Sequence, residues 1–232
     1  MRINIIGDIA GRYDEFLLLL EKMPEADLVI SVGDLIDRGP KSRQVIEWFM
    51  ANTATGKAEA IFGNHEDLFL NAISYGDLGD WTRNGGIATI LSYIKEYEHL
   101  SSFEEMLELA KQKNSTVREI MDLAHFPDEI KEWLKNRPLY YSTDELFISH
   151  APVPSLNHLP EDRFKTNFHF IWNRVDPRQR QDKFFIHGHQ GRFKEFKDES
   201  GVFGYCIDNC SENELMGIHW PSKEIFKQPY LT

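Results

Sequence analysis

The sequence predicts an α/β fold, and two patterns carry this prediction. Short apolar runs of strand length alternate with longer amphipathic segments through the N-terminal third of the chain, and each run ends in glycine and polar residues. Strands that alternate with helices are typical of βαβ units, so we expect a largely parallel sheet. From about residue 76 to 136 the periodicity is helical and no strand is convincing, which indicates a helical insertion.

The expected elements begin with three strand–helix pairs. The strands are predicted at 2–6, 28–32 and 58–62, and the helices at 13–22, about 42–51 and 66–73. Pro24 ends the first helix because its ring leaves no N–H to continue the ladder. Ligands of such folds gather at the carboxyl ends of the strands.

The rest of the chain is predicted to be helical first and then β-rich. The insertion should hold helices at 87–97, 102–113 and 117–124, and Pro127 and Pro138 mark its exit. Later strands are predicted at 146–149, 183–186, 202–208 and 215–220, and the last two should pair antiparallel across a polar turn. The length favours one domain over residues 1–232.

Composition excludes several classes of protein. A net charge of −11 argues against a broad face for duplex nucleic acid, which needs a basic stripe, although metals and a few arginines can still attract an anionic substrate. No apolar run approaches the roughly 20 residues of a membrane-spanning helix. Asp8 interrupts the first apolar stretch before a signal peptide could form, so we expect a cytoplasmic protein. Cys206 and Cys210 are too few for a disulfide framework and are expected as buried thiols without a redox role.

Polar residues of the kinds that bind metals follow the strand ends. They occur in Gly7-Asp8, Gly33-Asp34, Gly63-Asn64-His65-Glu66, Ser149-His150 and His187-Gly188-His189. Any one of them is most often a simple turn, because glycine supplies unusual φ angles and aspartate caps helices. Parallel strands bring such ends to one rim, where carboxylates would repel each other unless a cation lay between them. Together they predict a metal centre.

Several segments make a family resemblance specific. GDIAG, GDLIDRG and GNHE, followed by ISHAP, IWNR and HGHQ, resemble the calcineurin-like metallophosphoesterases. The resemblance is closest to the phosphoprotein phosphatase (Ser/Thr phosphatase) branch in its small bacterial and bacteriophage form, and it covers most of the chain. WTRNGG, with Thr89 beyond it, is similar to the start of the helical insertion in these short members. The resemblance implies a β-sandwich of mixed sheets flanked by helices.

The resemblance also implies two divalent cations, about 3.5–4 Å apart as in other two-metal sites. Asp8 would bind the first metal, Asp34 would bridge, and the second metal would take Asn64, His150 and His189. His187 is the rival of His189, but the family pattern places the ligand after the glycine. The donor set suits Mn²⁺, our preferred metal, while Fe, Zn²⁺ and Mg²⁺ also fit.

The remaining motif positions carry implied catalytic roles. His65 would protonate the leaving alcohol, and Asp37 would orient its imidazole. Arg38 and Arg174 would grip the phosphate beside Asn64, although a surface arginine is the alternative for Arg174. The implied reaction is an in-line attack on phosphorus by a metal-bridging hydroxide, without a covalent intermediate.

One position departs from the family pattern. The first motif of the family reads Gly-Asp-x-His-Gly, and Ala10 stands where the histidine belongs. Three explanations of Ala10 are open: water or another side chain replaces the imidazole, the histidine was changed by engineering, or the chain is a binding module without catalysis. Intact His65, Asp37, Arg38 and Arg174 favour an enzyme. We therefore expect the first metal site to be weak or empty.

The motifs leave three functions open. We favour a serine/threonine protein phosphatase; the alternatives are a hydrolase of dinucleoside polyphosphates or other nucleotides and a phosphate-binding module. Trp81 and Tyr93 could stack on a base, but packing in the helical core explains them better. Five histidines match no motif and are expected to be solvated or satisfied in the core: His99, His125, His158, His169 and His219. The sequence carries no signal of oligomeric state.

Overall fold

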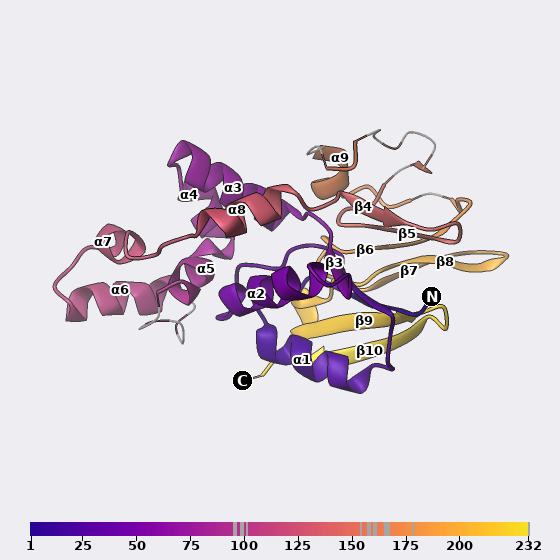
Figure 1. Cartoon of the computed structure of the whole chain (residues 1–232), viewed down its shortest axis with the longest axis horizontal. Coiled ribbons are helices and arrows are strands. Elements are labelled where there is room, and N and C mark those ends of the chain that lie inside the picture. The colour runs from indigo at the N-terminus through magenta and orange to yellow at the C-terminus, as the bar shows by residue number, and fades with distance from the viewer. Residues whose placement is uncertain are drawn as a thin grey trace.

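The computed structural model shows two mixed β-sheets packed face to face, with helices outside them (Figure 1). It describes residues 1–94, 97, 100, 102–153, 155–156, 159, 162–164, 168–177 and 179–231. The expected sandwich of mixed sheets is confirmed. The three N-terminal strands are parallel, as expected, but antiparallel strands complete both sheets, so neither sheet is parallel throughout.

The first sheet holds the N-terminal strands and the two last strands of the chain. Its order is β10-β9-β1-β2-β3. β1, β2 and β3 are parallel, whereas β9 pairs antiparallel with both β1 and β10. The bounds are β1 Ile3–Ile6, β2 Leu28–Ser31, β3 Ala58–Ala60, β9 Glu214–Trp220 and β10 Glu224–Pro229.

The second sheet has the order β4-β5-β6-β8-β7, with β5, β6 and β8 parallel. Its strands are β4 Tyr140–Ser142, β5 Leu146–Ser149, β6 Phe184–His187, β7 Lys194–Asp198 and β8 Gly201–Cys206. The predicted antiparallel pairing of 202–208 with 215–220 was wrong, because β8 and β9 lie in different sheets. Tyr205 and Met216 are instead buried in one cluster between the sheets, so the two strands face each other across the core.

Three strands escaped the sequence prediction, and each lies at the edge of a sheet. β4, β7 and β10 have mostly half-buried or exposed residues. In β7, for example, only Phe196 is buried. Edge strands are solvated on one side and carry charged residues, so they lack the apolar run that identifies a central strand.

Three helices connect the parallel strands of the first sheet. α1 spans Tyr13–Lys22, as predicted, α2 Ser42–Thr53 and α3 Asn64–Tyr75. α3 begins two residues before the predicted position because Glu66 accepts the Gly63 N–H at 2.9 Å, which satisfies a donor at the helix start. Asn64 and His65 therefore lie in the first turn of a helix, where their side chains are held firmly.

The segment between α3 and β4 is helical, as expected, and projects to one side of the sheets (Figure 1). α5 ends at Ser92, earlier than predicted, and α4, the kinked turn Thr82–Gly86 and α8 were not predicted. The segment comprises α4 Gly79–Trp81, the kinked turn Thr82–Gly86, α5 Ile87–Ser92, α6 Phe103–Gln112, α7 Val117–Met121 and α8 Asp128–Lys135. A short α9, Phe168–Ile171, follows β5.

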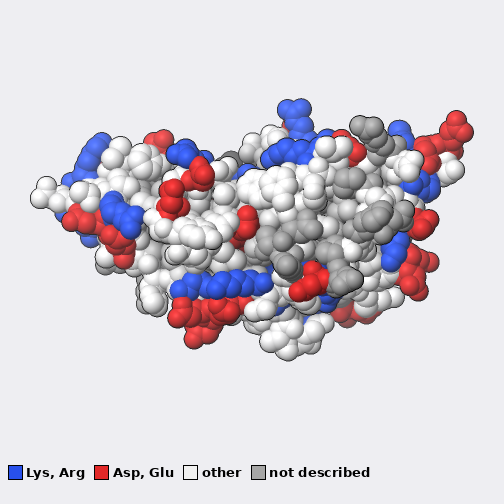
Figure 2. All heavy atoms as spheres, turned by 90° about the horizontal axis from the view of Figure 1, so that it is seen from above, with Lys and Arg blue, Asp and Glu red and all other residues white. Residues whose placement is uncertain are grey.

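The surface carries both signs of charge. Figure 2 shows basic and acidic side chains interspersed over one face, without a continuous basic stripe among the described residues. Within the described part of the chain, no helix has the length and apolar character needed to cross a bilayer.

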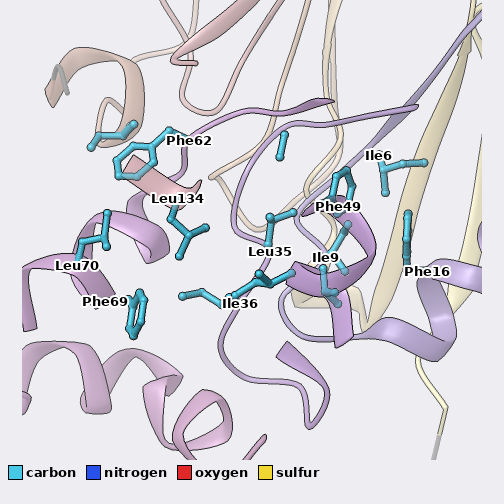
Figure 3. Close-up of a cluster of buried hydrophobic side chains, with 14 of the residues drawn as sticks. Ile6, Ile9, Phe16, Leu35, Ile36, Phe49, Phe62, Phe69, Leu70 and Leu134 are labelled. Atoms are coloured by element: carbon cyan, nitrogen blue, oxygen red, sulfur yellow. The ribbon is translucent and has the colours of Figure 1, made fainter. Parts of the chain in front are cut away.

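Two apolar clusters support the site. One lies between the sheets and includes Ile5 and Ile148. The other includes residues of both sheets that are not in the first cluster and extends into the helical segment, where Leu134 of α8 and Phe69 of α3 lie near Leu35 and Ile36 (Figure 3). Leu35 and Ile36 belong to the loop after β2, so the loop that presents polar residues on one side is anchored by apolar residues on the other.

Candidate metal centre and active site

The five predicted metal ligands come together at one end of the two sheets. Asp8, Asp34 and Asn64 follow β1, β2 and β3, while His150 and His189 follow β5 and β6 of the other sheet. All five are at most 5% exposed. Ligand atoms of Asp8, Asp34 and His150 lie within 4.8 Å of one another. Asn64 Oδ1 lies 2.8 Å from His150 Nε2 and 2.7 Å from His189 Nδ1, so all five form one cluster.

The backbone of these loops is unusual. Asp34 and His189 have φ angles of 51° and 71°, a left-handed region that costs most non-glycine residues about 1–3 kcal/mol. Glycines let the loops approach closely. A Cβ on Gly188 would overlap the Asp8 carboxylate, and one on Gly63 would overlap that of Asp34. The Gly residues in HGHQ and GNHE therefore keep room for the polar cluster.

The hydrogen bonding of His150 supports a cation in this cluster. Its Nδ1–H donates to the Val32 carbonyl at 3.1 Å, and burial lowers the pKa of the imidazole, so the ring is neutral. The lone pair of Nε2 then faces two other acceptors, Asn64 Oδ1 at 2.8 Å and Asp34 Oδ1 at 3.3 Å. Acceptors that converge without a hydrogen are the arrangement that a divalent cation stabilises.

The buried carboxylates also support a cation in this cluster. Burial raises the pKa of Asp8 well above its usual range, and the neighbouring Asp208 and Asp34 raise it further. The backbone N–H of His189 donates to Asp8 Oδ2 at 3.1 Å, which offsets only part of this effect. A bound cation would remove the repulsion, so the residues present fit a metal.

Asp208 also lies beside the cluster, although the sequence did not predict a role for it. It follows β8, is 3% exposed, and accepts the N–H groups of Cys210, at 3.1 Å, and of Gly191. Both of its oxygens are thus engaged in holding loops beside Asp8. The sequence signal was the one that identified Asp8 and Asp34, an aspartate at the end of an apolar strand.

Asp34 occupies the centre of the cluster. Although burial would raise its pKa, the positive charges of the His150 and His65 imidazoles, when protonated, lower it below the usual range. Its Oδ1 accepts the backbone N–H of His65 at 3.0 Å. The buried Glu66 fixes the surrounding loops, because its carboxylate accepts the N–H groups of Asp34, Leu35 and Gly63 at 2.9–3.0 Å.

His65 and Asp37 form a close pair beside the cluster. His65 Nδ1 lies 2.6 Å from Asp37 Oδ2, and an Arg38 guanidinium nitrogen lies 3.1 Å from His65 Nε2. Burial alone would lower the pKa of the imidazole, but the Asp34 carboxylate and then the hydrogen bond with Asp37 raise it to about 9. The raised pKa favours the protonated imidazole in the metal-free site, whereas the Arg38 guanidinium, which can only donate, faces Nε2 and opposes its protonation.

Two residues of the helical segment also reach this pair. Trp81 donates its indole N–H to the Asp37 carboxylate at 2.9 Å, and Thr89 donates its hydroxyl at 2.7 Å. Trp81 is 1% exposed and packs against Phe69, as expected from helix packing. Its hydrogen bond to Asp37 was not predicted. The only sequence signal for this part of the chain was the similarity of the WTRNGG stretch to the family.

A pocket of about 140 Å³ opens onto the cluster. Arg38 and Arg174, both exposed, line it together with Asn84, Trp172 and Cys210. The expectation of two buried thiols was wrong for Cys210, which is half-buried with Sγ 3.4 Å from the Arg38 guanidinium. Two larger hollows, of about 470 and 540 Å³, share none of these residues.

The histidines that the sequence did not assign to the metal centre or to catalysis include two that are buried. His187 is buried and packs against the rings of Phe185 and Phe196, which agrees with a packing role. Of the histidines without a motif, His99 and His158 lie outside the described residues. His219 is buried with Nδ1 2.7 Å from Asn4 Oδ1.

Ala10, two residues after Asp8, is buried and has a φ of 48°. Its N–H donates to the Asp34 carbonyl at 2.8 Å, and its carbonyl accepts the Gly39 N–H at 2.9 Å. The loop therefore keeps a fixed geometry through its backbone, while the methyl group offers no ligand atom.

Comparison with known proteins agrees with this geometry. The family model of calcineurin-like phosphoesterases matches residues 1–204. The chain is 29% identical over 158 residues to a symmetrical bis(5'-nucleosyl)-tetraphosphatase of Methylococcus capsulatus, across 66% of this chain and 44% of that protein. It is 38% identical over 92 residues to serine/threonine-protein phosphatase 2 of Escherichia coli, across 36% of this chain and 38% of that protein.

The chain thus spans less than half the length of these two relatives. Among solved structures, one of a proposed diadenosine tetraphosphatase matches all of this chain and 94% of its own, with a TM-score of 0.59 and 18% identity. A metallophosphoesterase from Sphaerobacter thermophilus matches all of this chain and 88% of its own, with a TM-score of 0.52 and 14% identity. These structures show a shared fold. Because the family model matches residues 1–204, the chain belongs to the calcineurin-like phosphoesterases, a family of metal-dependent hydrolases.

Proposed function

We propose that the chain hydrolyses phosphoserine or phosphothreonine in proteins. The observation that carries this proposal is the pocket of about 140 Å³ bordered by His65 and two arginines. Pockets that enclose a whole small molecule usually measure about 300–1,000 Å³. A phosphoryl group on a short side chain suits the smaller volume, while the rest of a protein substrate stays outside.

We assign the metal ligands as the sequence predicted. Asp8 would hold the first cation, Asp34 would be shared, and Asn64, His150 and His189 would hold the second. Mn²⁺ is our preferred metal, since oxygen and imidazole donors without thiolate suit it. When bound, the cations polarise the phosphoryl oxygens and activate water as the nucleophile. Because Ala10 supplies no ligand, the first site should be the weaker one.

The side chains around the pocket would act on the phosphoryl group and the leaving alcohol. The guanidinium groups of Arg38 and Arg174 would hold the phosphoryl oxygens, whose charge grows in the transition state, beside the amide of Asn64. His65 would transfer its Nε2 proton to the leaving oxygen, while Asp37 holds the Nδ1–H.

A second candidate substrate is a dinucleoside polyphosphate. Trp172 lines the pocket, and its ring is nearly parallel to that of the exposed Phe168, with centroids 6.4 Å apart. Such aromatic surfaces stack on nucleobases. The relatives named as tetraphosphatases add support.

The organisation of the chain is part of the proposal. We propose one domain over residues 1–232, with residues of about 76–136 as a helical insertion in it. A cytoplasmic location stays a prediction from the sequence.

A substrate panel tests the function. Purified protein with Mn²⁺ or with EDTA would be given phosphoserine and phosphothreonine peptides, diadenosine tetraphosphate and p-nitrophenyl phosphate. We expect metal-dependent release of phosphate that is fastest from the peptides. His65→Gln should abolish most of it, whereas His125→Gln, an exposed histidine of the helical segment, should not. Preference for diadenosine tetraphosphate would select the second candidate, and no turnover on any substrate would indicate a binding module.

A further inference from the structure

The Asp37 carboxylate is held by the helical segment as well as by His65. The side chain is fully buried, and its Oδ1 lies 2.9 Å from the indole nitrogen of Trp81 and 2.7 Å from the hydroxyl of Thr89. Oδ2 lies 2.6 Å from His65 Nδ1 and 3.1 Å from the same indole nitrogen. Three donors thus surround one carboxylate, and two of them come from outside the strand-end loops.

The backbone of the same loop is held from the same side. The Asp37 N–H donates to the hydroxyls of Thr89 and Ser42, at 2.9 and 3.1 Å. The Arg38 N–H donates to the Gly85 carbonyl at 3.1 Å. Asp37 and Arg38 have φ angles of 74° and 63°, and such consecutive left-handed residues persist only where their surroundings impose them. The helical segment therefore supplies both backbone and side-chain contacts that fix Asp37.

A kink in the helical segment directs these contacts. It lies within Thr82–Gly86, where Gly85 has non-helical backbone angles and separates two helical stretches. Gly85 has a φ of 107°, and a Cβ there would lie 2.8 Å from Arg38 Cγ. A Cβ on Gly86 would meet the Trp81 ring at 2.5–2.7 Å. Two glycines thus allow the segment to press Trp81 toward Asp37 and the Gly85 carbonyl toward Arg38.

We propose that Trp81 and Thr89 are positioning residues that set the orientation of the His65 imidazole through Asp37. This inference rests on the proposed role of His65 as proton donor to the leaving group. With the carboxylate fixed at both oxygens, His65 Nδ1 stays directed at Asp37 and Nε2 stays directed into the pocket. Without either donor the carboxylate can rotate, and the imidazole follows it.

A positioning role has a kinetic consequence that a packing role lacks. A poor leaving group, such as the alkoxide of serine, needs a proton from His65, whereas p-nitrophenolate leaves without much help. Misorienting the imidazole should therefore slow hydrolysis of an alkyl phosphate much more than hydrolysis of p-nitrophenyl phosphate. General loosening of the pocket should slow both equally.

The variants separate the hydrogen bonds from the packing. Trp81→Phe keeps a ring against Phe69 but removes the indole N–H, and Thr89→Val keeps the shape but removes the hydroxyl. Thr89→Ser is the conservative rescue. Trp133→Phe is the matched control, because Trp133 donates its indole N–H to Thr53 and lies outside the pocket.

With Mn²⁺ present, Trp81→Phe and Thr89→Val should lower kcat for a phosphoserine peptide by about ten- to a hundredfold, within the share that general acids contribute. They should lower kcat for p-nitrophenyl phosphate less than threefold, with KM little changed. Thr89→Ser and Trp133→Phe should resemble the native protein. Equal losses on both substrates, or a Thr89→Ser variant as impaired as Thr89→Val, would overturn the proposal.

A second readout does not depend on turnover. In the Mg²⁺-loaded protein, the Nδ1–H proton of His65 should give a downfield NMR resonance, because it is buried in a short hydrogen bond. The resonance should move upfield or exchange faster in Trp81→Phe and Thr89→Val, and stay unchanged in Trp133→Phe. An unchanged resonance in the first two variants would contradict the inference. If the native protein hydrolysed neither substrate, the proposed function would fail, while this measurement would still decide the positioning.

Discussion

The backbone N–H of Ala10 donates to the carbonyl of Asp34 at 2.8 Å, which joins the loops after β1 and β2 that carry Asp8 and Asp34. Ala10 thereby preserves the loop that carries Asp8, although it contributes no ligand. At the proposed first metal site the loop is therefore held in place, but one donor of the family pattern is missing.

Restoring an imidazole should strengthen that site. In the native protein, calorimetric titration with Mn²⁺ should resolve one tight and one weak site, and Ala10→His should tighten the weak one by about tenfold or more, since it adds a ligand. Ala10→Gly is the matched control. It should leave both affinities unchanged, because it relieves the φ of 48° without adding a donor. Two equally tight sites in the native protein would contradict the prediction.

Removing the metal should destabilise the protein, and Asp8 should be a main cause. Burial and then the Asp208 and Asp34 carboxylates raise the pKa of Asp8, so its charged form is disfavoured in the metal-free fold. The metal-free protein should therefore lose stability as the pH rises from acidic to neutral values. Mn²⁺ at a hundred times its Kd should restore about 2.7 kcal/mol.

Asp8→Asn tests this explanation. The amide keeps an oxygen for the His189 N–H but carries no charge. In EDTA the variant should melt at a higher temperature than the native protein near pH 7, and it should gain less from Mn²⁺. If the melting temperature of the native protein changed with neither EDTA nor pH, the proposed role of carboxylate repulsion would be refuted.

The sequence predicted the local features of the fold and of the site. α1 was placed at its observed bounds, and the five ligand positions meet as expected, because short-range patterns and parallel strand ends determine both. The partners of β8 and β9 could not be predicted in this way. Their buried residues alternate in the same manner whether the strands pair side by side or face each other across the core.

The parts of the site that were missed depend on long-range contacts. Trp81 and Thr89 reach Asp37 from residues 44 and 52 positions away. Apart from the WTRNGG stretch, their sequence setting is that of ordinary core positions in helices, and nothing in it identifies the carboxylate that the indole N–H contacts. Cys210 was misjudged for a related reason, since its contact with Arg38 arises only when β8 and the loop after β2 come together.

The His65 imidazole should titrate with a pKa of about 9 in the metal-free protein. Burial opposes this shift, whereas Asp34 and the Asp37 hydrogen bond cause it. Because the folded pKa exceeds the unfolded value of about 6.5, the stabilisation is complete below pH 6.5 and is lost as the pH rises through 9. NMR titration of the ring in EDTA measures it. Asp37→Asn should lower the pKa, and an unshifted value near 6.5 in the native protein would contradict the prediction.

Glu66 should contribute more to stability than any exposed glutamate. It is 1% exposed, and its two oxygens accept three backbone N–H groups from the loops after β2 and β3. In Glu66→Gln one oxygen becomes an NH₂ group that faces a donor, so a buried N–H loses its partner. We expect a loss of about 2–3 kcal/mol in the free energy of unfolding, measured by urea titration. Glu129→Gln, at an exposed position of α8, should change it by less than about 0.5 kcal/mol. Equal stability of the two variants would show that the loops after β2 and β3 hold their shape without the carboxylate.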